Sequence, residues 1–478
     1  MKKLLTYLAL IGVFTSLTWF VIEKGNHIVR HTQGIIISQT ISPEEKATPG
    51  VIDSHANVVD QLINNISYPL SILLLQVIII LLTSSVFGAI FRKLGQQTVI
   101  GEIIAGVFLG PSFFGWLFPD LFALIFPYDS FLSLQFLSQI GLAFFMFVIG
   151  MELDLTKIKS KTHDAIIISQ VSIIFPFFLG ACVSYYVFQE LAPHGVSFLS
   201  FALFMGIAMS ITAFPVLARI IKERGLTKTP LGVLAITCAA ADDVTAWCLL
   251  AAAIAIVKAG SITSSLFTIG LAIAYIVFML YVIKPLLQKV SNNRMKDEKV
   301  DKTVIGVSFF LMLISAYFTE IIGIHALFGS FIAGVVMPNN LRFKEILTDK
   351  VEDVSTILLL PIFFAFTGLR TQIGLLNEGS LWVICTLIIS VAIIGKLAGS
   401  ALTARIIGRT WKDSLSIGAL MNTRGLMELI VLNIGYDLGV LGPEIFSIMV
   451  LMALFTTFMT GPLLDFINFS FRKFSHLN

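Results

Sequence analysis

The sequence predicts an all-α polytopic membrane protein whose inverted repeat contains two discontinuous helices. Hydrophobic residues make up 56% of the 478-residue chain and charged residues only 13%, with a mean hydropathy of +0.92. These values lie well outside the range of soluble globular domains. Two apolar segments, 197–220 and 414–435, carry helix-breaking residues at mid-depth. A third, 231–256, carries the adjacent carboxylates Asp242 and Asp243 at its centre.

Apolar segments of about 20 residues, long enough to cross a bilayer as helices, recur along the whole chain. We expect about thirteen core spans and one further span at the N-terminus. Their predicted bounds are 4–22, 69–91, 98–116, 129–151, 163–188, 197–220, 231–256, 262–288, 302–318, 321–338, 354–370, 381–404, 414–435 and 443–467.

The distribution of Lys and Arg supports this count, because cytoplasmic loops of membrane proteins are enriched in both. With alternate loops assigned to the cytoplasm, five basic residues lie outside, two lie within the membrane, and the other 25 of 32 are cytoplasmic. The external residues are Lys24, Arg30, Lys46, Lys258 and Arg370, and the intramembrane ones are Lys396 and Arg424. We therefore expect a multi-pass protein of the plasma (inner) membrane, in contact with the lipid bilayer, with both termini cytoplasmic and no nucleic-acid partner.

The chain divides by composition into four parts. Residues 1–22 form an N-terminal anchor or a signal-like segment, and the lack of an A-x-A-like cleavage site favours the uncleaved anchor. Residues 23–68 are an external polar stretch. Residues 69–467 form the transmembrane domain, with core helices at about 163–256 and 381–467, and residues 468–478 are a short cytoplasmic tail.

Two spans contain helix-breaking residues. In 197–220, Pro215 lacks a backbone donor and clashes with the preceding helical turn. The corresponding polar run in 414–435 comprises Asn422, Thr423, Arg424, Gly425 and Glu428. These are the sixth and thirteenth predicted spans, and an odd offset reverses direction across the membrane, so a repeat that relates them must be inverted. Such repeats with discontinuous helices are typical of transporters, whose substrate sites lie where the breaks meet.

Asp242 and Asp243 lie where a single charge costs roughly 2.5–3.5 kcal/mol on insertion. At 1.5 Å per residue, Lys396, Arg424 and Glu428 fall in the same central layer, so these five charges can compensate one another. Desolvation and the neighbouring carboxylate both disfavour a second negative charge. A carboxyl there would hold either a proton or a hard monovalent cation, which is the physical basis of exchange. Lys396 would pair with an aspartate when no ion is bound.

Each of these residues also has a purely structural interpretation. Asp–Lys pairs inside membrane proteins can simply stabilise the fold. Arg424 and Glu428, four residues apart on a helix, would pair locally. Thr245 and Ser210 are possible oxygen ligands, although hydroxyls bonded to helix carbonyls are commoner.

Two further polar residues lie within predicted spans. Glu102 is a candidate for the ion site and equally well a structural carboxyl. His325 is expected to be a packed histidine near a helix start rather than a proton relay.

The main enzymatic alternative is a membrane-embedded aspartyl protease. Adjacent residues on a helix point about 100° apart, so Asp242 and Asp243 cannot clamp one water molecule between them. The sequence also lacks a G-x-G-x-x-G motif, a P-loop and a metal-spaced His/Cys cluster. We therefore expect no enzyme activity, no cofactor and no metal other than a transported monovalent cation.

Six runs of the sequence together resemble the monovalent cation:proton antiporter-2 family, most closely its plant cation/H⁺ exchangers and bacterial sodium/proton antiporters. They include Ala241-Asp-Asp-Val-Thr-Ala-Trp and Asn422-Thr-Arg-Gly-Leu-Met-Glu-Leu-Ile, and the resemblance covers about 69–467. The six runs are 97–112, 213–219, 241–247, 323–329, 361–370 and 422–430.

The resemblance implies a homodimer with a dimerisation domain and a mobile core domain that moves like an elevator. It also implies that two discontinuous helices cross in the core. On this pattern Asp243 is the ion- and proton-binding carboxylate, Asp242 is the partner of Lys396, and members with these residues resemble the electrogenic exchangers. The helix-break and possible coordinating residues are Thr212, Ala213, Pro215, Asn422, Thr423, Arg424 and Glu428.

We therefore expect a secondary active antiporter that exchanges Na⁺ or K⁺ for H⁺ and serves pH homeostasis. Two alternatives stay open: a cation channel or uniporter of the same fold, and an ion-sensing or germination-type membrane receptor. A symporter for organic anions of the same fold is a weaker third, because adjacent aspartates suit a small cation better.

Overall fold

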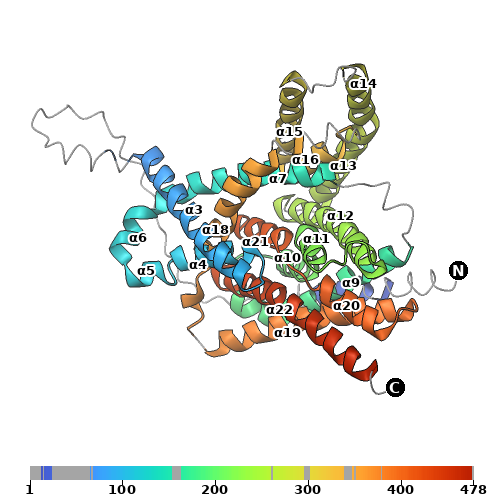
Figure 1. The fold of residues 1–478 in the computed structure, drawn as a ribbon. Helices are drawn as coiled ribbons and strands as arrows, with labels where there is room; N and C mark the ends of the chain where they lie inside the picture. The colour runs from blue at the N-terminus through green and yellow to red at the C-terminus, as the bar shows by residue number, and fades with distance from the viewer. Residues whose placement is uncertain are drawn as a thin grey trace, which may run out of the picture.

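The computed structural model describes residues 12–13, 15–23, 65, 68–152, 163–259, 262–294, 302–338, 347–348, 351–377 and 379–475. Every regular element in these ranges is a helix, which confirms the predicted all-α class (Figure 1). The helices of the first half are α3 (Pro69–Lys93), α4 (Thr98–Leu109), α5 (Phe114–Leu117), α6 (Pro119–Ile125), α7 (Phe131–Glu152), α9 (His163–Leu191), α10 (Phe198–Ser210), α11 (Phe214–Glu223) and α12 (Pro230–Ala259).

The second half begins with α13 (Ile262–Phe278), which continues through a π-helical turn, Met279–Ile283, into α14 (Lys284–Arg294). The remaining helices are α15 (Lys302–Ile322), α16 (Ala326–Val335), α18 (Leu360–Arg370, preceded by a π-helical turn at Ser355–Leu359), α19 (Gly379–Ile406), α20 (Trp411–Met421), α21 (Leu426–Asp437) and α22 (Pro443–Ser475). Short 3₁₀ turns lie at Tyr128–Ser130 and Ile373–Leu375.

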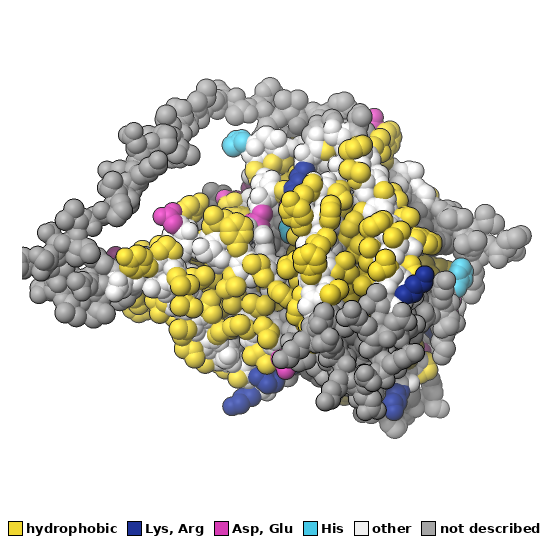
Figure 2. All heavy atoms as spheres, turned by 90° about the horizontal axis from the view of Figure 1, so that it is seen from above, with side chains coloured by type: hydrophobic (Ala, Val, Ile, Leu, Met, Phe, Trp, Pro, Cys, Tyr) yellow, Lys and Arg dark blue, Asp and Glu magenta, His cyan; other side chains and the backbone are white. Residues whose placement is uncertain are grey.

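Twelve stretches of the described residues are long and apolar enough to cross a membrane. Large hydrophobic side chains are exposed along them, and they cover most of the described surface in Figure 2. In a folded chain such a surface is expected to face lipid tails. The protein is therefore a multi-pass membrane protein, as predicted.

Three predicted boundaries differ from the structure or fall partly outside the described residues. The predicted span 321–338 contains only α16, whose 10 residues extend about 15 Å. It is short because the chain turns at Gly323 and His325, both with positive φ. The last helix continues to Ser475, through most of the predicted tail. Of the predicted first span, 4–22, only residues 12–13 and 15–22 are described, and these are helical.

Helix contacts divide most of the described spans into two groups. One group contains α9 to α12 and α19 to α22, and the other contains α3, α4, α7, α15, α16 and α18. The same packing pattern recurs in the two halves of the chain, with α3, α4 and α7 corresponding to α15, α16 and α18. The α3–α4 contact corresponds to α15–α16, and the α4–α18 contact corresponds to α16–α7. This recurrence supports the predicted inverted repeat, and the first group contains the predicted core helices.

Glycines allow α4 and α18 to approach each other closely. A Cβ on Gly106 would clash with the backbone of Ala365, and one on Gly368 with the carbonyl of Ile103. Small residues at helix crossings are the usual means of close packing in membranes, where the hydrophobic effect does not drive helices together. The α4–α18 crossing is therefore determined by backbone contact.

We predict that Gly106→Leu lowers the free energy of unfolding by about 1–3 kcal/mol, since the added side chain has no space at the α4–α18 crossing. The measurement is the melting temperature of the detergent-solubilised protein by size-exclusion chromatography. The matched control is Gly270→Ala on α13, where a Cβ would meet nothing within 4 Å. Equal melting temperatures for the two variants would contradict this account of the crossing.

Candidate functional site

Both predicted helix breaks are present, and they contact each other. The first separates α10 from α11, and Pro215 lies in the first turn of α11, where its missing N–H has no helical partner to lose. The second separates α20 from α21. The backbone N–H of Ala213 donates to the Thr423 carbonyl at 3.1 Å, and the Thr212 hydroxyl donates to the Met421 carbonyl at 3.0 Å. The two unwound segments therefore pack directly against one another.

Cationic side chains lie at the carboxyl ends of the two first half-helices. The guanidinium of Arg424 donates to the carbonyls of Ala208 and Met209 at the end of α10, both at 2.6 Å. At the end of α20, the Met421 carbonyl accepts from Thr212, whose oxygen in turn accepts from Lys396 Nζ at 2.6 Å. The end of a helix carries partial negative charge on unpaired carbonyls. Arg424 thus neutralises one end directly, and Lys396 neutralises the other through a hydroxyl.

Asp242 forms a buried ion pair with Lys396. Lys396 Nζ lies 3.1 Å from Asp242 Oδ2, and both side chains are fully buried. The hydroxyls of Ser169 and Ser172 on α9 donate to the same carboxylate at 2.6 and 2.9 Å. Both oxygens of Asp242 are therefore hydrogen-bonded, and its charge is compensated.

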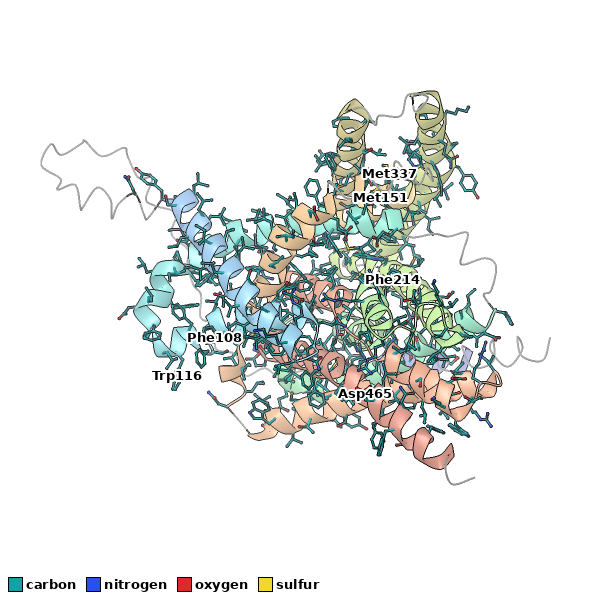
Figure 3. All side chains as sticks on the ribbon, in the orientation of Figure 1. Phe108, Trp116, Met151, Phe214, Met337 and Asp465 are labelled. Carbon is teal, nitrogen blue, oxygen red and sulfur yellow. The ribbon has the colours of Figure 1, made fainter. Side chains whose placement is uncertain are left out.

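Asp243 has a different environment, although it is the next residue. Its carboxyl accepts a hydrogen bond from the backbone N–H of Phe214, the first residue of α11. Figure 3 labels Phe214, a partly buried residue, beside α11 and α12. Asp243 is only 3% exposed, its Oδ1 has no hydrogen-bond partner, and it forms no ion pair within the described part of the chain. This carboxyl is held by a half-helix amino end rather than by a side-chain cation.

Arg424 and Glu428 lie close together, as their spacing predicts, but the contact is loose. Arg424 Nε is 3.7 Å from Glu428 Oε2, too long for a hydrogen bond, and both side chains are buried. Neither carboxylate oxygen of Glu428 has a hydrogen-bond donor. The pair compensates charge without fixing the carboxylate.

Further unpaired oxygens lie at the second break. The side-chain oxygens of Asn422 and Thr423 are buried and make no hydrogen bond. The backbone N–H of Ala213 donates to the Thr423 carbonyl, and the next N–H, that of Phe214, donates to the Asp243 carboxyl. The carboxyl of Asp243 therefore lies next to this break. Carboxylate, amide, hydroxyl and carbonyl oxygens are the ligands that hard cations prefer. Asp243, Asn422 and Thr423 are thus the side chains that could hold a monovalent cation here.

The remaining predicted candidates lie outside this cluster. The hydroxyls of Ser210 and Thr245 donate to helix carbonyls at 2.9 Å, the commoner of the two expected arrangements. Glu102 is buried on α4, where its charge interacts with that of Arg219 on α11. His325 caps α16, since the Leu327 N–H donates to its Nδ1 at 3.3 Å.

Three residues around the aspartates were not predicted from the sequence. Ser169 and Ser172 bind Asp242, and their spacing of three residues in an apolar span was the available signal. The third is Trp247, one turn after Asp243, whose ring stacks on Phe331 of α16 at 5.7 Å. Its indole N–H is buried without an acceptor. A tryptophan in a membrane helix gives no such signal by itself.

Comparison with known proteins identifies relatives over most of the chain. The family described as sodium/hydrogen exchanger, transmembrane, matches residues 78–469. The Na(+)/H(+) antiporter NhaS4 of Synechocystis sp. is 45% identical over 395 residues, covering 82% of this chain and 96% of that protein. Cation/H(+) antiporter 17 of Arabidopsis thaliana is 40% identical, covering 87% of this chain and 50% of its own. For K(+)/H(+) antiporter 1 of Saccharomyces cerevisiae the identity is 35%, with 84% and 46% covered.

The chain thus spans about half the length of these plant and yeast relatives. Among solved structures, the sodium proton antiporter MjNhaP1 from Methanocaldococcus jannaschii matches with a TM-score of 0.61 at 15% identity. The match covers 84% of this chain and 98% of that one, and it shows that the two share a fold. All of these relatives are transporters, which confirms the prediction that the chain is not an enzyme.

We predict that Lys396→Met lowers the free energy of unfolding by about 3–5 kcal/mol, because it leaves the buried Asp242 carboxylate without its cation. The double variant Asp242→Leu/Lys396→Met should recover most of this loss, since it removes both charges. Melting temperatures of the purified variants test both statements.

The control for this pair is Arg409→Met. Arg409 lies 3.2 Å from Asp164, but both side chains are more than a third exposed. An exposed pair contributes about 1 kcal/mol or less, so the melting temperature should change little. A Lys396→Met variant as stable as Arg409→Met would contradict the assigned pairing.

Proposed function

The chain belongs to the sodium/hydrogen exchanger family, and we propose that it exchanges a monovalent cation for protons by alternating access. Asp243 is the proposed carrier of both ions. The observation that carries the proposal is that Asp243, alone of the three buried carboxyl groups around the helix breaks, has no cationic partner among the described residues, and its Oδ1 also lacks a hydrogen bond.

A count of buried charges supports this role. Asp242, Asp243 and Glu428 are acidic, and Lys396 and Arg424 are basic, so the cluster carries one uncompensated negative charge when all five are ionised. A lone charge in a dry interior is costly. One proton or one monovalent cation removes it, but both together would leave a positive charge. This competition couples the two ions.

The neighbouring groups have supporting roles in the proposal. The amino end of α11 stabilises the ionised form of Asp243 when a cation arrives. Oxygens of Asn422 and Thr423 replace part of the hydration shell of that cation. Asp242 and Lys396 hold α12 and α19 together, and the lysine is the cation that can shift towards Asp243 after the transported ion leaves.

We infer the transported cation, the oligomeric state and the membrane location from the relatives. Relatives are named as Na⁺/H⁺ and as K⁺/H⁺ antiporters, and we propose Na⁺ or K⁺ as the cation. We further propose a homodimer in the plasma membrane with both termini cytoplasmic. The helices of 163–256 and 381–467 would form a mobile core that moves against the other group.

We predict that Asp243→Asn abolishes cation-driven proton movement in everted vesicles, because the amide can neither release a proton nor balance a cation. Folding should be retained, since Asp243 forms no ion pair in the described structure. Dye quenching on addition of Na⁺, K⁺ or Li⁺ measures the exchange. The matched control, Asp120→Asn on the exposed end of α6, should exchange as the wild type does.

Full exchange by the Asp243→Asn protein would refute the role of this carboxyl. The same vesicles separate an antiporter from a channel. An antiporter collapses a preformed proton gradient when a cation is added even with the membrane potential clamped at zero. A channel moves the cation and leaves that proton gradient in place.

A further inference from the structure

The two half-helices that follow the breaks differ in exposure. One face of α11 is exposed, including Arg219 and Lys222. Its counterpart α21 is buried from Leu426 to Gly435. From the break, α11 runs towards the predicted cytoplasmic side and α21 towards the predicted external side. The site is therefore covered more completely on the external side.

A cluster of polar side chains holds the outer end of α21 against the other helix group. Arg370 on α18 lies 2.7 Å from Asp437 Oδ1 and 3.2 Å from Asn433 Oδ1. Gln135 on α7 donates to Asp437 Oδ2 at 2.9 Å, and Asn433 donates to Thr367 at 2.8 Å. Three helices are joined through the last turn of α21.

Arg370 is held more rigidly than a surface arginine. Its guanidinium lies 4.3 Å from the ring centre of Phe366 and 5.2 Å from that of Tyr436, and its side chain is 12% exposed. Hydrogen bonds between charged groups gain strength when water is largely excluded. The cavity beside the cluster has a volume of only about 20 Å³, room for about one water molecule. A hydrated cation cannot pass there.

Contacts between the helix groups are also present towards the predicted cytoplasmic side. Between α4 and α11, Gln97 donates to the Val216 carbonyl at 3.3 Å, and Arg219 lies 3.5 Å from the Thr98 hydroxyl. The charge of Glu102 on α4 also interacts with that of Arg219. Among the described residues, the shortest ion pair between the helix groups is Arg370–Asp437, at the outer end of α21.

We propose that Arg370 and Asp437 form an external latch, a positioning pair that holds α21 closed over the ion site while the site faces the cytoplasm. The proposal rests on alternating access as proposed above. The latch must open for Asp243 to reach the external side, so its strength sets how often the transporter faces outward. Trp247 stacked on Phe331 closes the same side nearer to Asp243.

The experiment measures how fast the outer end of α21 becomes accessible. Ile434 lines the small cavity one turn before Asp437 and is 4% exposed. In a background whose four native cysteines are replaced, Ile434→Cys is labelled from outside with a membrane-impermeant maleimide in right-side-out vesicles. Asp437→Asn and Arg370→Gln should each raise the labelling rate by about tenfold, the effect of losing one charge-assisted hydrogen bond.

The matched control is Lys258→Gln. Lys258 pairs with Glu320 at 3.3 Å on the same predicted side, between α12 and α15, but both side chains are at least a third exposed. The Ile434→Cys protein that also carries Lys258→Gln should be labelled at the same rate as the parent protein. The charge swap Arg370→Asp/Asp437→Arg should restore slow labelling, which a general loosening of the fold would not do.

Unchanged labelling in both single variants would overturn the latch, as would fast labelling in the charge-swapped protein. If a single variant fails to fold, the charge-swapped protein provides the test. The proposal is overturned if that protein does not recover both the fold and slow labelling. Exchange by the parent protein is measured in parallel. If the parent protein exchanges normally and the variants are labelled at the parent rate, the latch alone is rejected. If the parent protein shows no cation/proton exchange, the proposed function is rejected.

Discussion

Two helices interrupted at mid-depth impose the main constraint on this structure. Each interruption leaves carbonyls and N–H groups without helical partners, where no water is available to bind them. The chain meets this requirement locally. One backbone hydrogen bond, from Ala213 to Thr423, joins the breaks. Arg424 and Lys396 neutralise the carboxyl ends, and the Asp243 carboxyl accepts from the amino end of α11. The charged residues at the centre of the protein follow from this geometry.

The same arrangement leaves a single buried carboxyl, that of Asp243, without a cationic partner among the described residues. Asp242 is neutralised by Lys396 and by two serine hydroxyls, and Glu428 lies beside Arg424. Asp243 receives one backbone hydrogen bond and no cation from the described residues. In the proposed mechanism the neighbouring aspartates therefore have different roles, Asp242 a structural one and Asp243 one in exchange. Because both lie on one rigid helix, α12, a movement of that helix carries the proposed ion site and its lysine-bound neighbour together.

Much of this could be predicted from the sequence. Pro215 and the polar run from Asn422 to Glu428 identified both breaks, and the helical rise of 1.5 Å per residue placed the charges at one depth. The partner of Lys396 could not be derived in this way, because adjacent aspartates share the same depth, and only the family resemblance separated them. Ser169 and Ser172 of α9 were not predicted, because a hydroxyl in an apolar span is usually bonded to its own helix. The short α16 was missed because hydropathy does not register the turn at Gly323 and His325.

In the proposed mechanism one buried carboxyl, that of Asp243, holds either a proton or a cation. Binding of a cation should therefore release a proton from the purified protein. Purified protein in a weakly buffered solution with a pH indicator is titrated with Na⁺ and K⁺, while calorimetry measures binding. We expect about one proton to be released per cation bound at low pH, and fewer protons per cation as the pH rises. Cation binding with no proton release at any pH would exclude competition for one carboxyl.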